Sequence, residues 1–401
     1  MKRKHMVLAT FVPSSYSGWG VLCLNLMLQW GQNEDLALLS TCPLEPDMIK
    51  LDPLGERAIA PLIRGSMDIQ AMLAKRAGER VDMPCPLLAG LGNQLVHTGS
   101  GIPNVTLSGR PNVGMLFLER TDLSAEALRR AAEYELLLVG SSWNRDILRA
   151  RGVEGVEVAI QGVDPTLFHP APSSGLWRDR FVVFSGGKLE VRKGQDLVIR
   201  AFRRFAESHP EALLVTAWSS LWPTLARRFD QQPEIEPVPF AEDGSFDAAE
   251  WTRRNGIPDD RVIHLGMVPN DVMPRLMREA DVALFPNRAE GGTNVVAMEC
   301  LACGVPTILS ANTGHLDIIR EDTCFPLMRQ SPVPAHDAEG WGESDLDEVV
   351  ETLERVHADR PAARQRGLQG AEFMTGLTWR RYAETVAGHL RPWLTDEAFL
   401  A

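Results

Sequence analysis

The sequence predicts an α/β protein made of two Rossmann-like, doubly wound domains that face a cleft. Two observations support this prediction. Short apolar runs alternate with longer amphipathic stretches along the 401 residues, and the alternation breaks at a proline-rich segment, 164–175. Strands that alternate with helices indicate parallel sheets with helices on both faces, and the chain is long enough for two hydrophobic cores.

In the first half of the chain, several apolar runs are short enough to be buried strands. They span residues 6–12, 36–41, 113–118, 136–139 and 156–160. Helices are predicted over 21–30 and 124–133, the second with Ser124 at its N-cap. Residues 43–110 are rich in proline, glycine and mixed turns, so we expect irregular structure there.

The second half begins after segment 164–175, whose three prolines and two serines are typical of a linker. Strands are predicted at 181–185, 213–217, 262–265, 282–285 and 307–309. Helices are predicted at 194–207, 271–279, 295–302, 345–356 and 379–393. We therefore expect a first domain over 1–170, a second over 176–378, and a C-terminal helix within 379–401.

The charge balance excludes one class of partner. Lys and Arg number 41 against 53 Asp and Glu, which gives a formal net charge of −12. An acidic surface does not attract phosphate backbones, so no nucleic-acid partner is expected. No apolar run approaches the roughly 18 residues of a membrane span, so no transmembrane segment is predicted.

The N-terminus and the cysteines indicate an ordinary cytoplasmic protein. The basic residues 2–5 precede a short apolar run without a cleavage site, so a first buried strand is predicted rather than a signal peptide. Among the six cysteines only Cys300 and Cys303 are close in sequence. A zinc site needs a second pair or two histidines at ligand spacing, so no metal site is predicted.

The loops after parallel strands are where ligands bind, and three of them contain suitable residues. The loop after strand 181–185 begins with Gly186 and Gly187, which let a ligand approach the backbone. Lys188, Arg192 and Lys193 follow with three positive charges. A helix start behind them adds a positive dipole end, so the loop suits a diphosphate. A solvated basic turn is the alternative.

The loop after strand 282–285 presents a glycine pair in front of a helix. Gly291 and Gly292 offer backbone N–H groups to an anion, and Thr293 or Asn294 caps the helix at 295–302.

Two glutamates accompany this second loop. Glu290 lies at its mouth, and Glu299 lies inside an otherwise largely apolar helix. Their carboxylates suit sugar hydroxyls, although a glutamate on a helix is more often simply solvated.

The third loop, residues 13–20, follows the first strand and ends in Gly18 and Gly20. A G-x-G before a helix suggests a dinucleotide fingerprint, but Cys23 stands where the third glycine belongs. A turn near a phosphate, a turn on the acceptor side and a plain strand-to-helix turn all fit this pattern.

Taken together, these motifs resemble the family 4 retaining glycosyltransferases, which have the two-domain GT-B fold. Segments 187–194 and 201–202 resemble the family's "G-R-L…K-G…A-F" signature, and segment 290–306 resembles its "E-G…E-A-M-A-C-G-x-P" signature. Segments 141–143, 162–164 and 168–170 resemble the end of the N-terminal domain and the hinge. In this family the C-terminal helix returns to the first domain, so the resemblance implies that the helix within 379–401 braces the two domains.

The resemblance implies roles for residues at matching positions. Lys188 and Lys193 would hold the donor diphosphate, Glu290 would contact the donor sugar, and Glu299 would contact the nucleotide ribose. The implied catalytic residues are Glu290, Lys193 and Lys188. The implied donor-binding set is Gly18, Gly20, Gly187, Lys188, Lys193, Glu290, Gly291, Gly292, Thr293, Asn294 and Glu299.

The chain departs from the family pattern in two places. Its two glutamates are nine residues apart, whereas the family spaces them by eight. The family places a histidine after a middle N-terminal strand, whereas residues 88–93 contain none and the nearest is His97. These departures concern the acceptor side more than donor binding.

The resemblance therefore implies a hexosyl-type glycosyltransferase that acts with retention and without a metal cofactor. Its expected partners are a UDP- or GDP-sugar donor and a glycan, lipid-linked or protein acceptor. Three alternatives are a sugar-binding or scaffold protein without turnover, a nucleotide-sugar epimerase, and a dehydrogenase. The missing third glycine disfavours the dehydrogenase.

Overall fold

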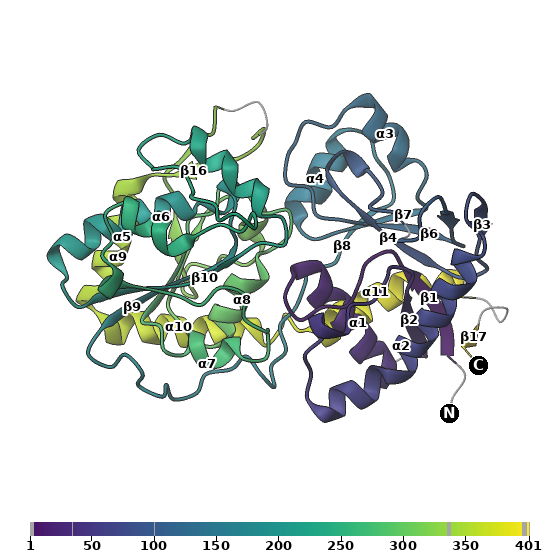
Figure 1. Cartoon of the computed structure of the whole chain (residues 1–401), viewed down its shortest axis with the longest axis horizontal. Helices are drawn as coiled ribbons and strands as arrows, with labels where there is room; N and C mark the ends of the chain where they lie inside the picture. The colour runs from purple at the N-terminus through teal and green to yellow at the C-terminus, as the bar shows by residue number, and fades with distance from the viewer. Residues whose placement is uncertain (1–3, 34, 100, 335–337, 395–398, 401) are drawn as a thin grey trace. The chain divides into compact units, whose positions relative to one another are not determined.

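The structure is a computed structural model that describes residues 4–33, 35–99, 101–334, 338–394 and 399–400. The chain divides into two compact units (Figure 1). Unit 1 comprises Met1–Gly162, Pro269–Asp271 and Leu377–Ala401, and unit 2 comprises Val163–Val268 and Val272–Gly376. Each unit is built around its own, largely parallel sheet, so the predicted fold class is confirmed.

The sheet of unit 1 has the order β17-β1-β4-β6-β7-β8, with β2 paired to β1. Its strands are β1 (Lys4–Ala9), β2 (Leu36–Ser40), β4 (Leu87–Leu91), β6 (Asn112–Leu116), β7 (Leu136–Val139), β8 (Val156–Val158) and β17 (Phe399–Leu400). All pairs are parallel except β1 with β17. Because β2 and β4 both pair with the same residues of β1, they lie on its opposite edges, and the strand order reverses there.

The helices of unit 1 include one from the C-terminus. They are α1 (Gly18–Asn33), α2 (Pro53–Ala74), α3 (Ala125–Ala131), α4 (Ser142–Ala150) and α11 (Trp379–Leu390). The indole N–H of Trp30 in α1 donates to the carbonyl of Ala383 in α11 at 3.0 Å. The C-terminal helix therefore packs on the first helix of unit 1 (Figure 1).

The irregular structure predicted for 43–110 is wrong. Helix α2 fills much of this segment, and β4 lies in the middle of the sheet. Asp52 caps α2 by accepting from the backbone N–H groups of Leu54 and Gly55, and Pro53 occupies its first turn, where no N–H is needed. Pro61 lies inside this helix, which explains why proline content gave the wrong prediction.

The sheet of unit 2 is wholly parallel, with the order β11-β10-β9-β12-β13-β14. Its strands are β9 (Phe181–Lys188), β10 (Ala212–Ser219), β11 (Val262–His264), β12 (Val282–Phe285), β13 (Thr307–Ser310) and β14 (Phe325–Leu327). Its helices are α5 (Gln195–Ser208), α6 (Ala248–Arg254), α7 (Met273–Met277), α8 (Val295–Ala302), α9 (Leu346–Ala358) and α10 (Arg360–Met374).

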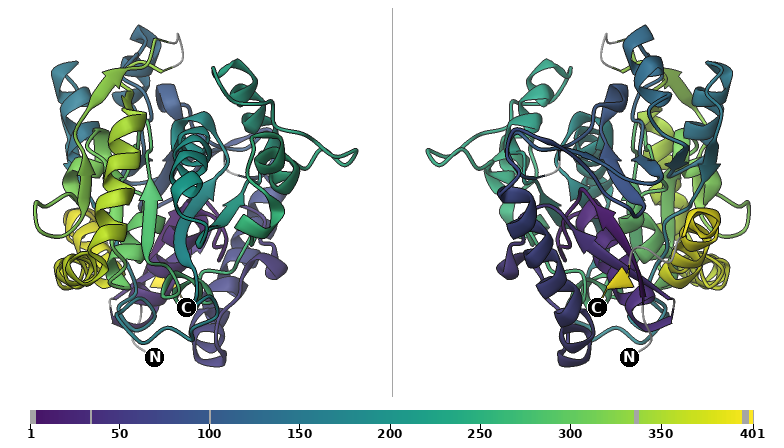
Figure 2. Two further views of the ribbon diagram at one scale, coloured as in Figure 1. Left: turned by 90° about the vertical axis from the view of Figure 1, so that its left-hand side faces the viewer. Right: turned by 90° about the vertical axis from the view of Figure 1, so that its right-hand side faces the viewer.

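Helices cover both faces of this sheet. Helices α5 and α9 pack together on one face, over a core that includes Phe181, Phe202 and Leu353 (Figure 2). Helices α8 and α10 pack together on the other face (Figure 1). The sheet is thus buried on both sides, which explains why its strands read as continuous apolar runs.

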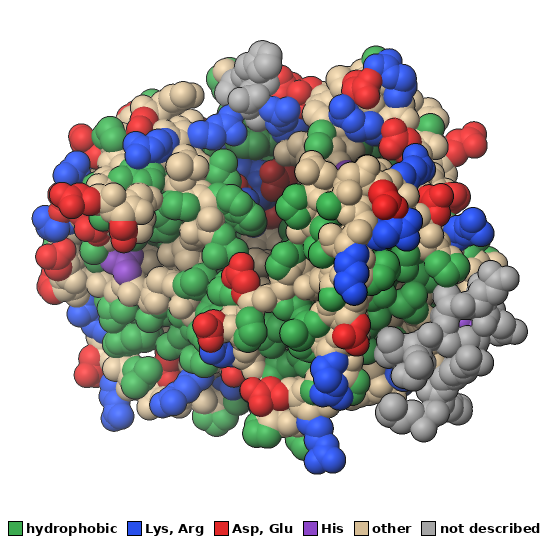
Figure 3. Space-filling view, turned by 45° about the vertical axis from the view of Figure 1, so that its right-hand side comes forward, with side chains coloured by type: hydrophobic (Ala, Val, Ile, Leu, Met, Phe, Trp, Pro, Cys, Tyr) green, Lys and Arg blue, Asp and Glu red, His purple; other side chains and the backbone are tan. Residues whose placement is uncertain are grey.

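The surface charges and the character of the helices agree with the charge balance and the hydropathy of the sequence. On the face shown in Figure 3, acidic and basic side chains are interspersed, without a single basic field. Among the described residues, no helix combines the length and the apolar character needed to cross a bilayer.

Candidate functional site

The strand order of unit 2 reverses between β9 and β12. Strands β9, β10 and β11 run outward in one direction, whereas β12, β13 and β14 run outward in the other. In such sheets the loops that follow the two central strands diverge and leave a crevice for ligands. These loops are residues 189–194 after β9 and residues 286–294 after β12, which contain most of the predicted site residues.

The two loops are held together by close backbone contacts. Gly194 has a φ of 71°, and a Cβ atom there would lie 2.3 Å from the carbonyl oxygen of Pro286. The backbone N–H of Arg288 donates to the carbonyl of Arg192 at 2.7 Å. Glycine is therefore required at position 194 because no side chain fits between the loops.

A cluster of buried and half-buried charges lies where these loops meet. We call it the switch-point cluster, and it consists of Lys188, Glu190, Arg192, Lys193 and Glu290. Lys193 Nζ lies 2.6 Å from Glu290 Oε1, and Arg192 Nη1 lies 3.0 Å from Glu290 Oε2. Arg192 also pairs with Glu190, whose other oxygen lies 3.0 Å from Lys188 Nζ. Three cationic side chains face two carboxylates, which leaves an excess of positive charge.

The electrostatics of the cluster favour an ionised Glu290. Burial opposes ionisation of this carboxyl group, which is only 4% exposed, but Lys193 and Arg192 outweigh burial and lower its pKa to about 2. Burial is also the main reason that the pKa of Lys193 is lowered, although Glu290 counteracts it. Asn287 donates its side-chain amide to Glu290 as well.

The predicted residues Lys188 and Lys193 occupy different surroundings. Lys193 contacts Glu290 directly, whereas Lys188 pairs with Glu190 and lies 5.6 Å from the centre of the exposed Trp222 ring. Gly187, with a φ of 119°, is part of β9 rather than of a loop. Sequence reasoning counted Arg192 among the three charges that suit a diphosphate, but it could not show that this side chain joins Glu190 to Glu290.

A second group of contacts fixes the glycine loop, residues 290–294. The backbone N–H of Glu290 donates to Thr313 Oγ1 at 2.8 Å, and the N–H of Gly314 donates to the carbonyl of Glu290 at 3.0 Å. A Cβ atom at Gly314 would lie only 1.7 Å from the carbonyl oxygen of Gly292. The loop after β13 therefore supports the glycine loop, and sequence reasoning missed it.

The glycine loop leads directly into helix α8. Asn294, and not Thr293, caps this helix by accepting from the backbone N–H of Ala297 at 3.4 Å. Asn294 has a φ of 61°, and its side-chain amide lies 3.2 Å from Nε2 of the buried His315. Burial lowers the pKa of His315 to about 4, so the imidazole is neutral and accepts this hydrogen bond.

The last predicted residue of this site, Glu299, lies inside α8 and is 2% exposed. Gly291 and Gly292, like Thr293, are buried in the glycine loop. The structure thus gathers Lys188, Lys193 and residues 290–294 at one edge of the unit 2 sheet.

The predicted glycines of unit 1 follow β1. A Cβ atom at Gly20 would lie 2.3 Å from the Cβ of Ser14, so this glycine permits close packing of the loop on α1. A Cβ atom at Gly18 would meet open space. No packing contact therefore requires glycine at position 18.

His97 lies near the end of β4, beside β1. It forms an isolated bridge with Leu91, the last residue of β4, and its Nδ1 accepts from the backbone N–H of Gly99 at 2.8 Å. Burial lowers its pKa. Sequence reasoning gave this histidine little weight, but the structure places it at the carboxyl edge of the unit 1 sheet, where its strand order reverses.

Parts of the chain are similar in sequence to known glycosyltransferases. A family model described as "Family 4 Glycosyltransferase in conflict systems" matches residues 269–386. D-inositol 3-phosphate glycosyltransferase of Kribbella flavida is 26% identical over 245 residues, which are 59% of this chain and 50% of that protein. A GDP-mannose-dependent phosphatidylinositol dimannoside mannosyltransferase of Mycobacterium tuberculosis is 25% identical over 201 residues, 49% of this chain and 46% of that protein. The chain thus spans about half the length of these curated relatives.

Solved structures share the fold. Sucrose-phosphate synthase from Thermosynechococcus elongatus aligns over 97% of this chain and 99% of its own, with a TM-score of 0.62 and 18% identity. Anabaena HepE in complex with UDP and glucose aligns over 97% and 100%, with a TM-score of 0.63 and 16% identity. At these identities the likeness concerns the fold, and it extends over both units.

Proposed function

We propose that this chain is a family 4 glycosyltransferase with the GT-B fold, and that it transfers a sugar from a nucleotide-sugar donor to an acceptor hydroxyl with retention of anomeric configuration. The observation that carries the proposal is the switch-point cluster. Its excess positive charge lies beside a glycine loop that precedes helix α8. This combination suits a diphosphate joined to a sugar.

The proposed donor is a UDP- or GDP-sugar. HepE, which shares the fold, is described in complex with UDP and with UDP-glucose, and one sequence relative is named as GDP-mannose-dependent. A hexosyl donor is consistent with both names. The acceptor hydroxyl would belong to a glycan, a lipid-linked sugar or a protein.

In the proposed reaction, the cations act on the leaving group. Lys193, Lys188 and the N-terminus of α8 would stabilise the negative charge that develops on the departing nucleoside diphosphate, without a metal ion. The acceptor oxygen would form the new bond to the anomeric carbon on the face from which the phosphate departs. The phosphate oxygen that leaves would take the proton of the acceptor hydroxyl.

The carboxylates have a different proposed task. Glu290 is ionised at neutral pH and can accept hydrogen bonds from hydroxyl groups of the donor sugar. Glu299 would accept from the nucleotide ribose. His97, at the carboxyl edge of the other sheet, is a candidate for the acceptor side.

The comparisons favour neither the scaffold without turnover nor the epimerase. The cytoplasmic location stays a prediction from the sequence, as does the bracing role of the C-terminal helix.

Proton NMR of a reaction mixture tests the proposal. UDP- and GDP-hexoses are each incubated with the protein and a panel of sugar acceptors, and the anomeric signals are followed. We expect release of one nucleoside diphosphate, dependent on an acceptor, and a product with the donor's anomeric configuration. Inversion would contradict retention, whereas a changed donor sugar without acceptor would indicate an epimerase. Lys193→Ala should abolish turnover, whereas Arg204→Ala, at an exposed ion pair with Asp347, should not.

A further inference from the structure

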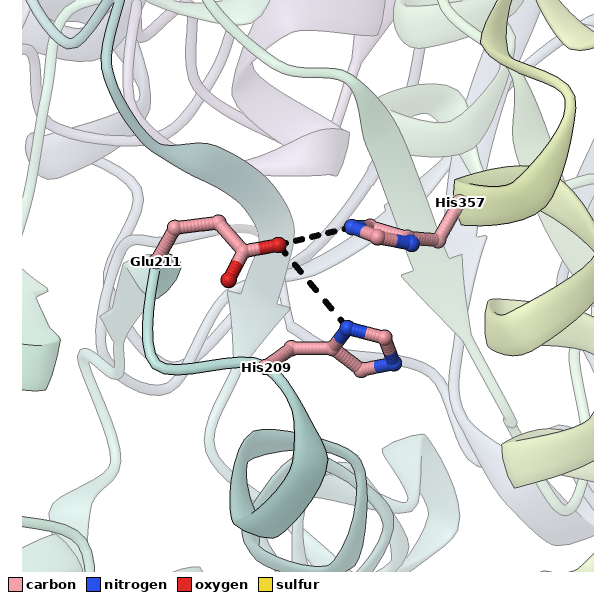
Figure 4. A group of neighbouring side chains, drawn as sticks. All are labelled: His209, Glu211 and His357. Atoms are coloured by element: carbon pink, nitrogen blue, oxygen red, sulfur yellow. Dashed lines mark hydrogen bonds and ion pairs between the residues drawn. The ribbon is translucent and has the colours of Figure 1, made fainter.

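Two histidines that are far apart in the sequence meet at the edge of unit 2 that lies opposite the switch-point cluster. His209 caps the C-terminus of α5, Glu211 immediately precedes β10, and His357 lies in the last turn of α9. One nitrogen or oxygen atom from each of the three side chains lies within 4.8 Å of the others (Figure 4). The site loops follow the carboxyl ends of the strands, whereas this group lies where β10 begins.

We propose that His209, Glu211 and His357 bind one Zn²⁺ ion that joins α5 to α9. Two imidazoles and one carboxylate form a donor set typical of zinc sites that keep a fourth position for water. The inference rests on the fold of unit 2 and is independent of the proposed transfer reaction.

The distances suit a tetrahedral ion after small side-chain movements. His357 Nε2 donates a hydrogen bond to Glu211 Oε1 at 2.7 Å, and His209 Nδ1 lies 3.8 Å from the same oxygen. Zn²⁺ would take the place of the proton on His357 Nε2, which leaves or moves to Nδ1 when the metal binds. Zn²⁺ with bonds of about 2.0–2.1 Å keeps neighbouring ligand atoms about 3.3 Å apart. The observed spacings fall on either side of this value.

A fourth residue sets the tautomer of His209. Nε2 of His209 lies 2.8 Å from Glu354 Oε2, and because a carboxylate only accepts, Nε2 is the nitrogen that donates. In the neutral ring, Nδ1 then carries a lone pair, and it faces the Glu211 carboxylate at 3.8 Å. A cation between these two acceptors would satisfy both. A histidine that donates to a carboxylate through its second nitrogen is the usual arrangement around protein-bound zinc.

Aromatic side chains hold both imidazole rings in place. Phe205 packs against His209 with ring centroids 4.3 Å apart, and Phe181 packs against His357 at 4.8 Å. These aromatic contacts limit the rotation of the imidazoles.

Zinc titration of the full chain, after metal removal with a chelator, tests the proposal. We expect about one Zn²⁺ bound per chain by isothermal titration calorimetry and elemental analysis, and a higher Tm with zinc than without. His209→Gln and His357→Gln should each abolish this binding. His169→Gln, which changes an exposed histidine of the same unit, should leave it unchanged.

Glu354→Ala changes a half-buried residue that is not itself a proposed ligand. It should keep the stoichiometry of about one and weaken zinc binding by about 10–100-fold, because His209 loses its orienting partner. The proposal is overturned if the folded wild-type chain binds no zinc at micromolar concentration. It is equally overturned if zinc binding persists in both histidine variants or disappears in His169→Gln.

Discussion

Replacing Glu290 by glutamine tests how strongly the switch-point cluster stabilises unit 2. The pKa of Glu290 is about 2, whereas an unfolded glutamate has a pKa near ~4.3. Each pKa unit corresponds to about 1.4 kcal/mol, so the ionised carboxylate contributes about 3 kcal/mol to folding. We therefore expect Glu290→Gln to lower the free energy of unfolding by about 3 kcal/mol at pH 7.

The pH dependence of this difference has a definite sign. Because the folded pKa is lowered, the stabilisation is fully present above the unfolded pKa and is lost as the pH falls toward 2. Urea denaturation, followed by tryptophan fluorescence, should show a constant difference between the two proteins from about pH 8 to 5, and a smaller one below about pH 4.3.

The matched control is Glu351→Gln, which removes an exposed carboxylate that lies 2.9 Å from Arg329. An exposed pair contributes at most about 1 kcal/mol. Equal losses in Glu290→Gln and Glu351→Gln would refute the electrostatic reasoning. A difference between wild type and Glu290→Gln that grows as the pH falls would refute it as well.

The remaining predictions concern ligand binding. Glu290→Gln releases Lys193 from its ion pair, so the affinity for the nucleoside diphosphate should stay the same or rise. The rate of sugar transfer should fall at least about 100-fold. A larger loss of nucleotide affinity than of transfer rate would contradict this prediction. Lys193→Ala should weaken nucleotide binding by about 10–100-fold in calorimetry, since a charge-assisted hydrogen bond is worth about 1.5–3 kcal/mol, and an unchanged affinity would mean that the phosphates lie elsewhere. Glu299→Ala should weaken binding by about threefold to tenfold without unfolding the chain, and equal affinity would remove this residue from the site. Gly314→Ala should destabilise the chain by about 1–3 kcal/mol and abolish nucleotide binding, because the new Cβ would lie 1.7 Å from a carbonyl oxygen of the glycine loop. The control is Gly18→Ala, because a Cβ atom at position 18 meets open space. Equal Tm values for the two variants would contradict the packing argument.

The sequence predicted best the elements whose signals are local. Strand β12 and helix α8 begin and end at the predicted residues, because a short apolar run ends at a proline and a glycine–asparagine turn leads into the helix. Ser124 caps α3 as predicted, through the backbone N–H of Ala127. Helix α2 was missed because Pro61 occurs within it, and its buried residues could not be told from a loop by composition.

The site was predictable as a list of residues but not as a network. The pattern of glycines, lysines and glutamates indicated both loops, because motifs after parallel strands share one edge of the sheet. It could not show that Arg192 connects Glu190 to Glu290, or that Thr313 and Gly314 support the glycine loop. The contacts of Glu290 with Arg192, Thr313 and Gly314 join residues far apart in the sequence, as does the ring contact between His209 and His357.

The most direct test of the account is nucleotide binding by the wild-type chain and by Lys193→Ala, measured side by side with UDP, GDP, ADP and CDP. A ligand at 100 times its Kd stabilises a protein by about 2.7 kcal/mol, which a thermal shift detects readily. We predict that UDP or GDP raises the Tm of the wild-type chain and raises that of Lys193→Ala by about half as much or less, because a 10–100-fold weaker affinity leaves the ligand at only about 1–10 times the Kd of the variant. If no nucleotide raises the wild-type Tm, or if both proteins respond equally, the switch-point cluster is not a donor site.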